Sequence, residues 1–89
     1  MHSIDIVYTK YRQGLKDIRD EHSRFFEDAA FTIFDCYTFQ YTEGSPGVFA
    51  IPSYYHGRNY HKLLPEIKDK VKTFIEQLFE WVAEQKFED

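Results

Sequence analysis

The sequence contains a single cysteine, Cys36, among its 89 residues. A secreted domain of this length usually needs several disulfides, because its core is too small to stabilise it alone. We therefore expect a reducing compartment and a cytoplasmic protein. No apolar run approaches the ~20 residues of a membrane span, and the first residues lack the basic and apolar regions of a signal peptide.

Positive charge is also scarce. The 11 Lys and Arg residues are outnumbered by 15 Asp and Glu residues, which gives a formal net charge of -4. General binding to nucleic acid or to an anionic membrane needs a basic field, so both are disfavoured. Glycine-rich phosphate loops and zinc-finger spacings are absent as well. We expect no cofactor and no metal site.

Aromatic side chains are abundant, at 19% of the sequence. The hydrophobic content of 43% and the charged content of 29% are ordinary for a folded globule, and the length predicts a single domain over residues 1–89. A domain this small buries only about 60% of the surface of its unfolded chain. Its core must be thin, which leaves self-association open.

A helical period predicts one long helix from Ser3, its N-cap, to about Ala30. Gly14 interrupts this helix at a cost of about 1 kcal/mol relative to Ala, unless it admits a close neighbour. We expect His22 to be buried and hydrogen-bonded, since it falls on the apolar stripe. The stripe comprises Ile4, Tyr8, Tyr11, Leu15, Ile18, His22, Phe25 and Ala29.

From residue 31 the period changes to two. Residues 31–42 are mostly aromatic, β-branched or Thr, which predicts a strand. Turn residues at 43–47 and a second strand at 48–51 complete an antiparallel hairpin. Pro52 lacks a backbone donor, so the second strand ends there or lies at an edge. Residues 53–61 are predicted to be an irregular loop.

A second helix is predicted after this loop, with Pro65 in its first turn and Asn59 as a candidate cap. The fold class is α+β in the order α-β-β-α, with both helices on one face of a small sheet. The other face and the edges are left for loops or for assembly. The apolar face of this helix comprises Leu64, Ile67, Val71, Phe74, Ile75, Leu78, Trp81 and Val82.

The middle of the chain is rich in rings and poor in charge. Residues 31–61 hold nine of the 17 aromatic residues but only three charged ones, Asp35, Glu43 and Arg58. This composition is typical of an interface core, although aromatic residues also dominate small cores. We assign the following residues to the domain's own core: Phe31, Ile33, Phe39 and Phe49. Cys36 is expected to be a small buried hydrophobe.

The segment 54–61 is the first candidate site for a partner. Tyr and Arg are favoured at protein interfaces, and the same rings and guanidinium could stack a base and hold a phosphate. The segment could equally be an ordinary connecting loop. No residue visibly pairs with either histidine for acid/base chemistry, so we expect no enzyme. The candidate residues are Tyr54, Tyr55, His56, Arg58, Tyr60 and His61.

The second candidate site is a row of acids on the second predicted helix. Glu76, Glu80 and Glu84 stand four residues apart, so they form one ridge. Like charges at this spacing repel modestly, and acids near a helix C-terminus oppose the macrodipole. The ridge is either a solvated face or a surface that meets a basic partner.

Together these features predict a small acidic protein-binding module. The favoured role is inhibition of a macromolecular partner, in the manner of an immunity protein, an antitoxin or a phage-encoded blocker. An acidic protein is complementary to the basic surface of a nucleic-acid-directed toxin. One alternative is a nucleic-acid or nucleotide-binding module that uses residues 54–61. Another is a structural subunit that forms a homodimer through the hairpin.

Overall fold

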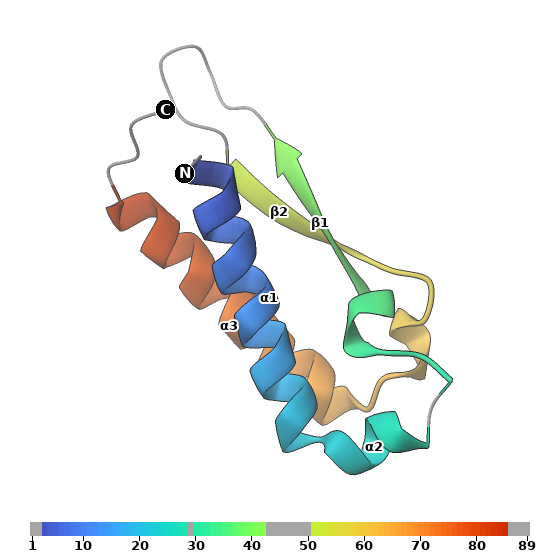
Figure 1. The fold of residues 1–89 in the computed structure, drawn as a ribbon. Coiled ribbons are helices and arrows are strands. Elements are labelled where there is room, and N and C mark those ends of the chain that lie inside the picture. Colours follow the sequence, from blue (N-terminus) through green and yellow to red (C-terminus); the bar gives the residue numbers. More distant parts are fainter. Residues whose placement is uncertain (1–2, 29, 43–50, 86–89) are drawn as a thin grey trace.

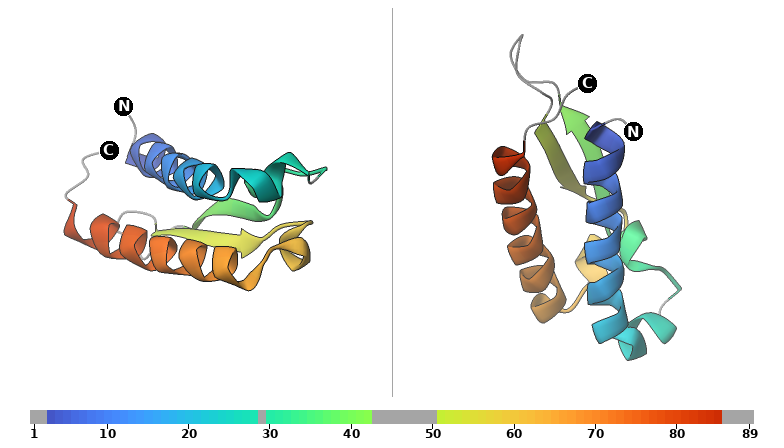
Figure 2. Two further views of the ribbon diagram at one scale, coloured as in Figure 1. Left: turned by 90° about the horizontal axis from the view of Figure 1, so that it is seen from below. Right: turned by 60° about the vertical axis from the view of Figure 1, so that its left-hand side comes forward.

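A computed structural model describes residues 3–28, 30–42 and 51–85 of the chain. Two long helices lie side by side and cover the same face of a two-stranded sheet (Figures 1 and 2). The predicted α+β class, the α-β-β-α order and the placement of the helices on one face are confirmed.

The two long helices are α1 (Ser3–Glu21) and α3 (Pro65–Glu84). They run in opposite directions, so that the N-terminal end of α1 lies beside the C-terminal end of α3 (Figure 1). Pro65 occupies the first turn of α3, as expected, and Leu64 is the N-cap. The buried side of α3 follows the predicted stripe: Ile67, Val71, Ile75, Leu78 and Val82.

The buried side of α1 differs by one position from the predicted stripe. Val7 is 3% exposed, whereas Tyr8 is 40% exposed. The core face runs through Val7, Tyr11, Leu15 and Ile18. The Tyr8 ring lies on the flank, with its centroid 5.4 Å from that of Phe39.

The sheet pairs β1 (Tyr37–Thr42) with β2 (Ile51–His56) in antiparallel register, with Tyr37 opposite His56. Side chains alternate between the two faces of a strand. Tyr37 is therefore buried against the helices at 4% exposure, while Tyr55 on the opposite face is 49% exposed. One face of the hairpin belongs to the core and the other is open.

The prediction of one helix as far as Ala30 is wrong. α1 ends at Glu21, and a short helix, α2 (Ser23–Glu27), follows a break at His22. The break redirects the chain, so that the rings in α2 reach back to Phe31. The Phe25 centroid lies 5.9 Å from that of Phe31, and the Phe26 centroid lies 6.1 Å away.

His22 is half-buried, and the expected hydrogen bond of its side chain is not found. Its Nε2 atom is buried and has no hydrogen-bond partner among the described residues. The backbone N–H of His22 does donate, to the carbonyl oxygens of Ile18 and Arg19. These bonds close the last turn of α1, and the break follows from the backbone of His22 itself, whose φ of -117° and ψ of 34° are not helical.

The prediction of a strand from residue 31 is also wrong. Ile33–Asp35 form a 3₁₀ turn, η1, and β1 begins only at Tyr37. The Asp35 carboxylate closes this turn by accepting hydrogen bonds from the N–H of Thr32 at 2.7 Å and from its hydroxyl at 3.2 Å. Ile33 and Cys36 are both fully buried, and Phe31 is 9% exposed.

β2 continues through Pro52 to His56, so the prediction of a loop from residue 53 is wrong for 53–56. Pro52 pairs with Tyr41 in a two-stranded sheet, which confirms the edge-strand alternative. The predicted turn at 43–47 lies outside the described residues. The same is true of most of the predicted strand at 48–51, including Phe49.

Gly57 fixes the exit from β2. Its N–H donates to the carbonyl oxygen of Cys36 at 2.7 Å, and a Cβ at this position would lie 2.7 Å from the carbonyl oxygen of Asp35. Only glycine fits this approach of two backbones. The chain then enters a second 3₁₀ turn, η2 (Tyr60–Lys62), which the Asn59 side chain does not cap.

Candidate functional site

The acidic ridge lies on α3 as predicted. Glu76, Glu80 and Glu84 are all exposed, on the side of the helix away from its buried stripe. None of the three forms an ion pair within the part of the chain that the structure describes. The row spans about 12 Å, at 1.5 Å per residue.

Half of the candidate residues in segment 54–61 pack against the domain itself. The His56 ring stacks on Tyr60, with centroids 3.6 Å apart and planes within 5°. Tyr37 meets Tyr60 edge-on at 5.5 Å, and the Nζ atom of Lys68 lies 4.6 Å from the same ring centroid. Tyr54 is half-buried beside Tyr37, at 6.1 Å. These rings join β2, η2 and α3.

The other half of the segment faces solvent. Tyr55, Arg58 and His61 are exposed, and Tyr55 lies on the open face of the sheet. His56 is exposed as well, although its ring stacks on Tyr60. These residues do not lie beside the ridge, because they come before the first turn of α3, whereas the ridge begins in the middle of that helix. Glu76 stands 11 residues further along that helix, about 16 Å away along its axis. The structure therefore leaves two separate surfaces.

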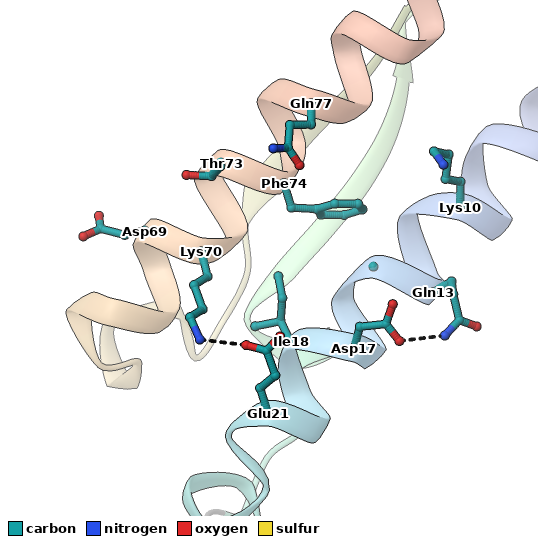
Figure 3. Close-up of a pocket in the computed structure, with 11 residues that line it drawn as sticks. Lys10, Gln13, Asp17, Ile18, Glu21, Asp69, Lys70, Thr73, Phe74 and Gln77 are labelled. Carbon is teal, nitrogen blue, oxygen red and sulfur yellow. Dashed lines mark hydrogen bonds and ion pairs between the residues drawn. The ribbon is translucent and has the colours of Figure 1, made fainter.

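A groove between α1 and α3, which the sequence did not predict, has a volume of about 610 Å³ (Figure 3). Its floor consists of Gly14, Ile18 and Phe74. The Phe74 side chain points from α3 toward α1 (Figure 3), and a Cβ at Gly14 would lie 2.0 Å from the tip of its ring. Gly14 thus admits a close neighbour, one of the two interpretations that the sequence left open.

The walls of the groove are polar. The Lys70 ammonium donates to Glu21 Oε2 at 2.7 Å across the groove, and this hydrogen bond lowers the pKa of Glu21 (Figure 3). Along α1, Gln13 Nε2 donates to Asp17 Oδ1 at 2.9 Å. The residues that form the walls are Lys10, Gln13, Asp17 and Glu21 from α1, with Asp69, Lys70, Thr73 and Gln77 from α3.

A basic strip on the flank of α1 was also not predicted. Arg12, Lys16 and Arg19 line a hollow of about 480 Å³ together with Tyr8 and Phe34. Among the described residues no carboxylate lines this hollow, although Arg19 donates to the neighbouring Asp20 Oδ1 at 2.9 Å. The Arg12 guanidinium lies 4.2 Å from the Phe34 ring centroid, and its Nη1 donates to the Tyr8 hydroxyl at 3.2 Å. The spacings of four and three residues are visible in the sequence, but the neighbouring Phe34 is not.

Cys36 is buried, as expected, and its thiol donates to the carbonyl oxygen of Thr32 at 3.5 Å. Burial, with a smaller contribution from the Asp35 charge, raises the pKa of this thiol to about 11. Among the described residues, no three His, Cys, Asp or Glu side chains lie together in a way that could hold a metal ion.

Comparisons of the chain with protein-family models, with curated proteins and with solved structures find no match. Over the described ranges, none of the helices combines the length and apolarity needed to cross a membrane. Function must therefore be inferred from four features: the ridge, the exposed residues of segment 54–61, the groove and the basic strip.

Proposed function

We propose that this chain is a small protein-binding module that covers a basic surface of a macromolecular partner and thereby inhibits it. The observation that carries the proposal is the ridge of Glu76, Glu80 and Glu84. Its carboxylates are exposed and aligned, and none of them forms an ion pair with another described residue. A partner that presents Lys or Arg side chains would relieve their mutual repulsion.

The ridge contributes mainly to the rate and orientation of docking. An exposed ion pair stabilises a complex by only about 0.2–1 kcal/mol, because water and salt screen it. Complementary potentials nevertheless speed diffusional encounter and exclude partners of like charge. Fast capture suits an immunity protein, an antitoxin or a phage-encoded blocker, whose partner must be neutralised on encounter.

Proteins that act on nucleic acids supply the kind of surface that this ridge fits, because they bind phosphates with Lys and Arg. Occupation of such a surface by carboxylates would exclude the nucleic acid. In this proposal the chain is a binding protein and not an enzyme, and its single cysteine suits a cytoplasmic location.

The test is affinity purification of the partner from the native cell, followed by association kinetics with the purified partner. The ridge variant carries Glu76→Gln, Glu80→Gln and Glu84→Gln. The matched control makes the same change in net charge elsewhere, with Glu27→Gln, Asp28→Asn and Glu66→Gln, which are exposed and lie in α2, at its C-cap and in the first turn of α3. We expect the ridge variant to associate about tenfold more slowly at low salt.

The control variant should keep most of the wild-type association rate, because α2 lies near the N-terminal end of α3 (Figure 1) and Glu66 lies about 15 Å from Glu76 along the helix axis. Equal association rates for the ridge variant and the wild type at low salt would rule out the ridge as the docking surface. A rate that falls equally in both variants would assign the effect to net charge alone.

The basic strip on α1 favours a second candidate function, binding of single-stranded nucleic acid. Arg12, Lys16 and Arg19 could hold phosphates beside the Phe34 ring, which is half-buried. Binding of a short single-stranded RNA should then weaken steeply with salt and should decrease in Arg12→Gln/Lys16→Gln. Binding that is undetectable at low salt would remove this candidate.

A further inference from the structure

The ridge and the groove between α1 and α3 are adjacent on the surface of α3. Thr73 stands three residues before Glu76, and Gln77 stands three residues before Glu80, so each wall residue neighbours a ridge carboxylate. Phe74 lies on the inner side of this wall. A partner that contacts the ridge would therefore also pass over the mouth of the groove.

We propose that the groove receives the bulky apolar side chains of a basic amphipathic segment of the partner. This inference rests on the proposed function, because the ridge would bring the same segment to the groove. The apolar side chains would pack on Phe74, Ile18 and Gly14. The cations of the segment would pair with carboxylates at the walls and along the ridge.

The dimensions of the groove suit such a segment. Its volume of about 610 Å³ lies in the range of sites that bind small ligands, about 300–1,000 Å³. Between Lys10 and Glu21 it extends about 16 Å along α1, which matches a helix of about 11 residues. Interfaces gain most of their affinity from a few apolar anchors in such depressions, with polar groups at the rim.

The charges at the walls determine which charge the partner's segment should carry. Both lysines of the groove are engaged, since Lys70 pairs with Glu21 and the Lys10 ammonium lies 4.7 Å from the Trp81 ring centroid. Asp17 and Asp69, on opposite walls, have no cation partner among the described residues. The charge left for a ligand is negative, so the groove favours Lys and Arg over Asp and Glu.

The probes are three synthetic helical peptides of about 14 residues. The first carries Leu side chains along one face and Lys or Arg along the other. The second keeps the basic residues but replaces Leu by Gln, and the third keeps Leu but replaces the basic residues by Glu. Each is titrated against the intact 89-residue chain by fluorescence anisotropy, with NMR shift mapping of the contact residues.

We expect the first peptide to bind about tenfold or more tightly than the second, because Leu side chains leave water on binding. The third should not bind. Thr73→Tyr and Gln77→Tyr should each reduce the advantage of the first peptide, because a ring at either exposed wall position takes up space at the mouth of the groove. Thr9→Tyr, at an exposed position of α1 outside the groove, is the matched control. Urea unfolding shows whether each variant is folded.

The outcomes separate the groove from the ridge. The proposal for the groove would be overturned if the first two peptides bound equally. It would also be overturned if Thr73→Tyr and Gln77→Tyr both left the advantage of the first peptide intact. Failure of the first peptide to bind, or tight binding of the third, would overturn it as well. The triple ridge variant provides the separation. If Thr73→Tyr reduces the advantage of the first peptide while the triple ridge variant binds both basic peptides like the wild type, the groove is a binding site and the ridge is not.

Discussion

The ring of Phe74 on α3 occupies the space that any side chain at Gly14 of α1 would need. An ideal Cβ at Gly14 would lie 2.0–2.6 Å from three atoms of that ring. Glycine in a helix costs about 1 kcal/mol relative to alanine, so the ring contact has to offset this cost. The same contact forms the floor of the groove and holds the two helices at close approach.

Gly14→Ala should therefore destabilise the protein, by about 1–3 kcal/mol, because the Phe74 ring must leave its site. In a Phe74→Ala background the same substitution should become stabilising by about 1 kcal/mol, since only helix propensity remains. Urea unfolding of the four proteins in this double-mutant cycle measures both values. A stabilising Gly14→Ala in the presence of Phe74 would contradict the contact.

Tyr11 and Tyr37 bring hydroxyl groups into the core that have no hydrogen-bond partner among the described residues. A buried hydroxyl without a partner costs about 1–3 kcal/mol, so removing it should be neutral or stabilising. We expect Tyr37→Phe to stabilise the protein in urea unfolding. Tyr8→Phe is the control, because that exposed hydroxyl accepts a hydrogen bond from Arg12. A large destabilisation by Tyr37→Phe would show that the hydroxyl has a partner after all.

The same two phenols predict how stability depends on alkaline pH. Burial raises the pKa of Tyr11 and Tyr37 above the ordinary value near 10.0. The unfolded chain loses these protons at a lower pH than the folded chain does. The free energy of unfolding is therefore unaffected by their ionisation below about pH 10 and falls as pH rises from there toward the higher folded pKa. The free energy of unfolding should fall less steeply between pH 9 and 11 in Tyr11→Phe/Tyr37→Phe than in the wild type. Parallel curves for the two proteins would contradict this assignment.

The presence and order of the two long helices and the hairpin were predictable because each depends on a local period, but their bounds were not: among the described residues, the second predicted strand shares only Ile51 with β2. α3 combines a continuous apolar stripe with Pro65 in its first turn. The 3₁₀ turn at Ile33–Asp35 was not predictable from alternation, because the hydrogen bonds between Thr32 and Asp35 decide it. The break at His22 was not predictable either, because the helical period continues through it in the sequence, whereas the ring contacts of α2 with Phe31 appear only in the fold.

The candidate sites divide in the same way. The ridge of Glu76, Glu80 and Glu84 requires only a helix of the predicted phase, and its exposure was predicted. Segment 54–61 required the register of β2, since a shift of one residue exchanges the inward Tyr54 for the outward Tyr55. The groove requires the tertiary meeting of Gly14 with Phe74, 60 positions apart, which no local pattern encodes.

Cys36 should react slowly with thiol reagents at pH 8. Its side chain is fully buried, and burial raises the pKa of the thiol to about 11, so the reactive thiolate is rare. Labelling with a disulfide reagent should accelerate by orders of magnitude across the urea unfolding transition. Rapid labelling of the folded protein would show that the contact between η1 and β1 opens readily.

The pair of Glu21 and Lys70 joins α1 to α3 at the wall of the groove, and it predicts an effect at acid pH. The hydrogen bond from Lys70, with its charge, lowers the pKa of the Glu21 carboxyl from its ordinary value of 4.5. The unfolded chain therefore binds this proton at a higher pH than the folded chain does. The contribution of the pair to the free energy of unfolding is fully present above the ordinary pKa of the carboxyl and is lost as pH falls through the folded pKa.

NMR titration of the Glu21 carboxyl should show the lowered pKa in the wild type and a value restored toward 4.5 in Lys70→Gln. Lys72→Gln removes an exposed lysine of the same helix outside the groove and should leave the Glu21 pKa lowered. If both variants titrate alike, the lowering comes from general charge and not from a bond across the groove.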